Sequence, residues 1–100
     1  MAIGRAARRI AREPAVIESF GPTRAGAALD LLELTELAWH DCYGEVTPPD
    51  SVIEDILVVA SGDLGELVSA ARMAVEDFRD LHLNSEAIRS GLRRRPRTHL

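Results

Sequence analysis

Apolar side chains recur at steps of three and four along most of this chain, a spacing typical of amphipathic helices. The clearest case is the segment 63–83, where Asp63 and Glu66 form a start similar to a capping box. The apolar stripe that follows consists of Leu64, Leu67, Val68, Ala71, Ala74, Val75, Phe78 and Leu81. This pattern predicts a long helix that buries one face.

A second helix is predicted over residues 24–43. Thr23 is a suitable N-cap, and Gly44 supplies the C-terminal stop. The leucine, alanine and tryptophan positions of this segment cover much of the helix circumference. We therefore expect the helix to pack against neighbours on more than one side.

The segment 50–60 is almost wholly apolar, with Glu54 and Asp55 as the polar residues in its middle. Its β-branched residues are typical of a strand. The entry through two prolines, with Asp50 or Ser51 as the cap and an acidic first turn, instead favours a buried helix.

The two ends of the chain are basic and differ from the middle. Residues 3–13 predict a short basic helix that Pro14 breaks, followed by a connector. We expect residues 1–22 to form a basic N-terminal arm and connector, 23–92 a helical-bundle domain, and 93–100 an arginine-rich tail.

Three main helices joined by short links predict an all-α protein, a small antiparallel helical bundle with short terminal helices. A chain of 100 residues forms one domain. Two long amphipathic helices and one buried helix carry more apolar surface than a single chain covers. We therefore expect a homodimer that completes a four-helix or larger bundle.

The amino-acid composition excludes several classes of protein. Hydrophobic residues make up 46% of the chain and charged residues 28%, which excludes wholesale disorder, and no apolar run has the length of a membrane span. The single cysteine, Cys42, excludes an internal disulfide framework and a zinc site made of cysteines alone. The N-terminal segment has no long apolar core, so we expect a cytoplasmic protein without a secretory signal.

All 12 basic residues are arginine, a bias that indicates a GC-rich bacterial genome.

The net charge of −4 hides a strong asymmetry along the chain. Residues 1–24 carry a charge of +3, residues 25–86 carry −12, and residues 87–100 carry +5. Basic ends on an acidic body suit three roles: binding a polyanion, docking on an acidic neighbour, or solubility. Nucleic-acid binding is not favoured, because the body is acidic and the tail lacks interleaved aromatic residues.

Four carboxylates form one candidate site. Glu33 and Glu36 lie along one side of the helix 24–43, together with His40, and Glu54 and Asp55 are close in the next helix. If the two helices face each other, these carboxylates meet and repel unless they hold a cation, and their oxygens suit magnesium.

This arrangement is similar to the all-α nucleoside triphosphate pyrophosphohydrolases, in which a Glu-x-x-Glu helix faces a second acidic helix around magnesium. The similarity covers residues 29–60. It implies a magnesium-dependent enzyme acting on nucleotide phosphates, with Glu33, Glu36, Glu54 and Asp55 as metal ligands. The family carries a Glu-x-x-Asp step on its second helix, whereas Glu54 and Asp55 are adjacent here.

The segment 39–45 gathers the only tryptophan, tyrosine and cysteine at one helix end. His40 and Cys42 point about 200° apart on a helix, so they do not form a catalytic pair by themselves. We expect Trp39 and Cys42 in the core and His40 facing water. In a complex, Trp39 and Tyr43 are the expected anchors, because aromatic residues dominate interface energetics.

These patterns favour a small helical protein–protein interaction module, an adaptor, regulator or accessory subunit without catalysis or a cofactor of its own. A partner would meet its aromatic helix end and its charged termini. The expected partner-binding residues are Trp39, Tyr43, Arg93, Arg94 and Arg95. The magnesium-dependent enzyme is the alternative.

Overall fold

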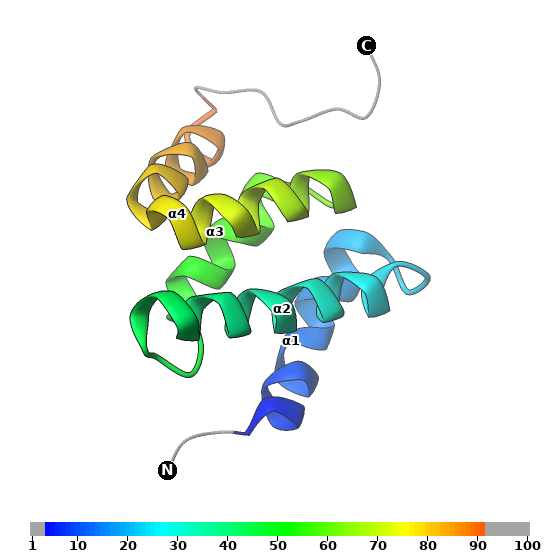
Figure 1. Cartoon of the computed structure of the whole chain (residues 1–100). Coiled ribbons are helices and arrows are strands. Elements are labelled where there is room, and N and C mark those ends of the chain that lie inside the picture. Colours follow the sequence, from blue (N-terminus) through cyan, green and yellow to red (C-terminus); the bar gives the residue numbers. More distant parts are fainter. Residues whose placement is uncertain (1–3, 92–100) are drawn as a thin grey trace.

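The computed structural model describes residues 4–91, which form four helices and no strand (Figure 1). In chain order these are α1 (Arg5–Phe20), α2 (Ala25–Tyr43), α3 (Asp50–Ala60) and α4 (Leu64–Arg89). The all-α prediction is confirmed, and α2 and α3 match the predicted segments to within one residue. Within residues 4–91, no helix is long and apolar enough to cross a membrane.

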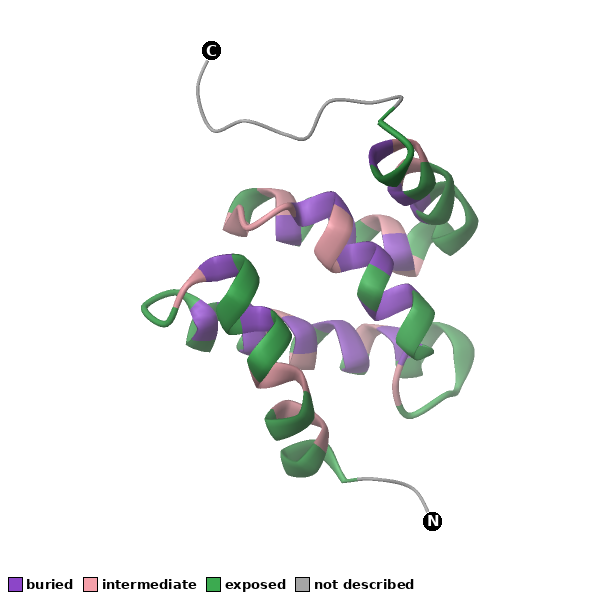
Figure 2. Cartoon of the chain, turned by 180° about the vertical axis from the view of Figure 1, so that it is seen from behind, coloured by how far each residue is buried: buried purple, intermediate pink, exposed green. Residues whose placement is uncertain are grey.

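Packing is uneven among the helices. α3 and α4 make the most extensive contact, α2 packs against α4, and α1 packs mainly against α2 (Figure 1). Buried residues line the inner faces of α2, α3 and α4 (Figure 2). The largest apolar side chains of this core with less than 2% exposure are Val16, Leu32, Ile56, Leu67 and Leu81.

α1 corrects one prediction, because the helix runs through Pro14 instead of ending there. A proline inside a helix removes one hydrogen bond and crowds the preceding turn, at a cost of about 3 kcal/mol. Pro14 lies on an exposed side of α1. Beyond it, Val16 and Phe20 are buried, and their packing offsets the cost. The predicted connector is therefore the last turns of a helix.

α4 corrects a second prediction, because it extends to Arg89 and is interrupted at Asp77. Asp77 has extended dihedral angles, φ −160° and ψ 89°, and its Oδ1 accepts hydrogen bonds from the backbone N–H groups of Arg79 and Asp80. It therefore acts as an N-cap for the second half of the helix. The break changes the direction of the chain, and Phe78, expected in the core, remains 39% exposed.

The predicted caps have mixed outcomes. Asp63 caps α4 as expected, with Oδ1 accepting from the Glu66 N–H at 2.9 Å, and Gly44 ends α2 in the left-handed conformation. The residues at the N-caps of α2 and α3 are Arg24 and Pro49, and neither makes a side-chain capping bond. The predictions of Thr23 as cap of α2, and of Asp50 or Ser51 as cap of α3, are wrong.

The turn between α3 and α4 also touches α1. Gly62 has φ +80°, and a Cβ atom there would lie 2.4 Å from the carbonyl oxygen of Ser19. A larger residue at this position would displace the C-terminal end of α1. Glycine is thus required both by the dihedral angle and by the close approach.

The capping role of Asp77 gives a first prediction. Asp77→Ala removes the carboxylate oxygen that accepts both backbone hydrogen bonds at the break, and should lower the free energy of unfolding by about 1 kcal/mol. Thermal melts should show a midpoint about 4–8 °C lower. Asp77→Asn keeps an acceptor and should retain most of the stability. Asp80→Ala, at an exposed acid three residues later, is the matched control. Equal melts for Asp77→Ala and Asp80→Ala would contradict the capping role.

Candidate interaction site

A buried carboxylate joins α1 to α2. Glu36 is 3% exposed, and its Oε2 accepts hydrogen bonds from Arg8 Nε at 2.7 Å, Arg12 Nη1 at 2.8 Å and Thr47 Oγ1 at 2.9 Å. Its Oε1 accepts a fourth bond from Arg8 Nη2 at 3.1 Å. Thr47 Oγ1 in turn accepts from Arg12 Nη2 at 2.9 Å. We call these four residues the Glu36 network.

The electrostatics of the Glu36 network favour the charged carboxylate. Burial alone would raise the pKa of Glu36, but the hydrogen bonds from Arg8, Thr47 and Arg12, with the charge of Arg12, outweigh it. The pKa of Glu36 therefore lies below its ordinary value. The bond to Glu36 also raises the pKa of Arg8. Two arginine side chains thus surround one buried carboxylate.

A second set of ion pairs extends this contact toward solvent. Arg9 Nη1 lies 2.7 Å from Asp30 Oδ1 and also pairs with Glu33. Hydrogen bonds to Asp30 and Glu33 raise the pKa of Arg9. Consecutive arginines of α1 thus meet successive carboxylates of α2, and the basic face of α1 packs on the acidic side of its neighbour.

The structure does not bring the four predicted metal ligands together. Glu33 and Glu36 are paired with arginines of α1, and Glu54 is exposed on α3. Asp55 is buried, and faces His82 and Arg89 of α4 instead. Among residues 4–91, no group of three or more His, Cys, Asp or Glu side chains is placed to hold a metal ion.

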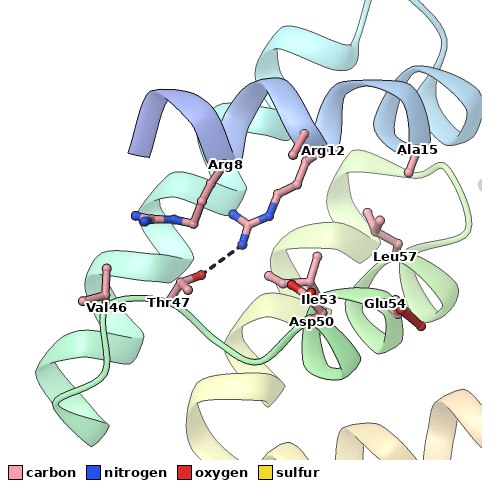
Figure 3. Close-up of a pocket in the computed structure, with 10 residues that line it drawn as sticks. Arg8, Arg12, Ala15, Val46, Thr47, Asp50, Ile53, Glu54 and Leu57 are labelled. Carbon is pink, nitrogen blue, oxygen red and sulfur yellow. Dashed lines mark hydrogen bonds between the residues drawn. The ribbon is translucent and has the colours of Figure 1, made fainter. Parts of the chain in front are cut away.

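A groove lies between α1 and α3 (Figure 3). Its volume is about 540 Å³, and we call it the α1–α3 groove. Two arginines of the Glu36 network line one side, and Asp50 and Glu54 lie on α3. The remaining lining is small or apolar: Ala11, Ala15, Val46, Ile53 and Leu57, with Thr47.

A smaller hollow of about 310 Å³ lies between α2 and α4. Two of its large apolar side chains face solvent, since Leu34 is 60% exposed and Val68 is 51% exposed. Arg72 and Glu76 line the hollow too, and form an exposed ion pair at 3.0 Å. The apolar lining, which we call the α2–α4 face, consists of Leu31, Leu34, Ala38, Val68, Ala71 and Val75.

The predicted aromatic anchors divide between core and surface. Trp39 is 3% exposed, as expected, and its indole N–H donates to Glu45. Tyr43 is exposed, and its hydroxyl donates a hydrogen bond to the Val75 carbonyl at 2.8 Å. The ring centroids of these two residues are 4.3 Å apart, and Phe78 completes the cluster. Cys42 is exposed, so its predicted place in the core is wrong.

Sequence reasoning missed one polar contact. His82 Nδ1 lies 3.0 Å from Asp55 Oδ2, and Arg89 Nη2 lies 3.6 Å from Asp55 Oδ1. These contacts tie the second half of α4 to α3. An acid within an otherwise apolar helix is the signal that could have found the contact, because a buried carboxylate requires a partner.

Arg93, Arg94 and Arg95 lie outside the described residues, so their predicted role in partner binding stays a prediction. Comparison with known proteins gives no match for this chain among family models, curated proteins or solved structures.

The Glu36 network generates a second prediction. Glu36→Gln removes the negative charge between two largely buried arginines, and should lower the free energy of unfolding by about 3 kcal/mol. Glu33→Gln is the control, because its partner Arg9 is partly exposed and such pairs contribute up to about 1 kcal/mol. Chemical denaturation of both variants measures the difference. Equal losses would contradict a special role for Glu36.

The same carboxylate predicts a pH dependence. Its pKa is lower in the folded than in the unfolded state, so the stabilisation is present above the unfolded pKa of about 4.3 and is lost as the pH falls through the folded pKa. The free energy of unfolding should fall less steeply on acidification below about pH 4.3 in Glu36→Gln than in the wild type. Identical acid slopes in denaturant titrations would contradict this assignment.

Proposed function

We propose that this chain is a small helical protein–protein interaction module without catalysis of its own, and that it acts as a homodimer joined through the α2–α4 face. The observation that carries this proposal is the exposure of Leu34 and Val68 side by side on adjacent helices. Apolar side chains that gather around a hollow, rimmed by charges, are typical of an interaction surface.

The energetics suit a symmetric dimer. Full burial of a leucine or valine side chain contributes about 1.5–3 kcal/mol. A two-fold contact buries Leu34 and Val68 of both copies. The charges at the rim are self-complementary, because Arg72 and Glu76 carry opposite signs one helical turn apart. A two-fold axis between them can pair Arg72 of one copy with Glu76 of the other.

Three of the four acids predicted as metal ligands instead form ion pairs with cationic side chains, which supports a non-catalytic role. These acids are Glu33, Glu36 and Asp55. A heterologous partner would meet the aromatic cluster through Tyr43 and Phe78, which are 40% and 39% exposed, while Trp39 supports them from the core. This refines the aromatic anchors expected from the sequence.

The proposal predicts the oligomeric state of point variants. The wild-type chain should sediment at twice its mass of 10.9 kDa. Leu34→Glu combined with Val68→Glu should yield a folded monomer, because two charges would be desolvated in each half of the interface. Ile10→Glu is the matched control, since Ile10 is 64% exposed but lies on α1.

Sedimentation equilibrium over a range of concentrations, with circular dichroism to verify folding, makes this measurement. A monomeric wild type at high concentration would contradict the dimer. A dimer that persists in the double variant would contradict this interface.

A further inference from the structure

Two acids of α3 line the α1–α3 groove. Asp50 and Glu54 are four residues apart on α3, both are exposed, and both line the groove (Figure 3). Within residues 4–91, neither carboxylate has a side-chain hydrogen bond or ion pair. On the other side of the groove, Arg8 and Arg12 are bonded to Glu36. The groove therefore combines an apolar lining with two carboxylates that can form ion pairs with a cationic ligand.

The chain itself supplies a ligand of that chemistry. Residues 4–91 contain eight arginines and sixteen acidic residues, a formal charge of −8, and residues 92–100 add four arginines and no acid. The segment 92–100 reads Leu-Arg-Arg-Arg-Pro-Arg-Thr-His-Leu, with a leucine at each end. An acidic surface with an apolar floor is complementary to such a segment in charge and in apolar character.

The geometry places this segment within reach. Arg89 lies against α3, because its Nη2 is 3.6 Å from Oδ1 of Asp55, the neighbour of Glu54 in sequence. Nine residues in extended form span up to about 30 Å. A helix with its side chains is about 10–12 Å across, so the segment is long enough to pass over α3 and enter the groove.

We propose that residues 92–100 of the chain dock in the α1–α3 groove, with arginines paired to Asp50 and Glu54 and leucine against the apolar floor. A short tether raises the effective concentration of the segment to the millimolar range, so that weak contacts suffice. The groove would then be available to a basic segment of another protein only after this segment is displaced.

Limited trypsin digestion of the full-length chain tests the docking, because cleavage after Arg93, Arg94 and Arg97 requires a released segment. The double variant Asp50→Asn with Glu54→Gln should be cleaved in this segment about five- to tenfold faster than the wild type, the effect of losing two partly exposed ion pairs. The matched control is Glu18→Gln with Asp41→Asn, also two exposed acids without a side-chain hydrogen bond or ion pair among residues 4–91, and both outside the groove. It should be cleaved at the wild-type rate.

Two further readouts keep the result decisive. Raising the salt concentration should accelerate cleavage of the wild-type chain without any substitution, because exposed ion pairs are screened. Dilution should leave the rate per molecule unchanged, because the contact is within one chain. Equal rates in all three proteins would overturn the proposal. Acceleration in the control variant alone, or protection that is lost on dilution, would overturn it too, since the segment would then lie on another surface of the chain or on a second copy.

Discussion

One buried carboxylate determines how the first helix joins the rest of the protein. Glu36 accepts four hydrogen bonds from Arg8, Arg12 and Thr47, and so connects α1, α2 and the loop that leads into α3. The described part of α1 before Val16 contains no buried residue. The first turns of α1 therefore have little apolar packing, and their position depends on charge.

This attachment has consequences for the surfaces of the molecule. Arg8 and Arg12 reach Glu36 of α2 from the wall of the α1–α3 groove, and the small residues Ala11 and Ala15 line the groove beside them. The opposite side of α2 is free of this network, and there Leu34 meets the exposed apolar side of α4. The two candidate surfaces thus lie on different sides of α2, so a dimer contact and an occupied groove are compatible.

The sequence predicted those helix bounds that are set by residues close together in the chain. α2 and α3 match their predicted bounds because strong stop signals, such as Gly44, coincide with the ends of apolar periodicity. The continuation of α1 past Pro14 was not predictable, because it depends on packing of Val16 and Phe20 against distant residues. Likewise, the break at Asp77 lies inside an uninterrupted helical pattern.

In the candidate site, too, the sequence predicted the position of residues within one helix but not their partners from another. Glu33 and Glu36 were placed correctly on one side of α2, but their partners come from α1, more than twenty residues away in sequence. An acidic stripe predicts that cations will gather there without identifying a metal or an arginine as their source. The basic residues of segment 3–13 carried that information, and only the fold shows that they face this stripe.

Hydrogen exchange of α1 in the wild type and in Glu36→Gln tests the central claim most directly. If the Glu36 network holds α1, the backbone amides of α1 around Arg12 should exchange faster in the variant by a much larger factor than those of α3, because this helix would detach by local opening. If the amides of α1 and α3 accelerate equally, or α1 is unaffected, the network does not position the helix.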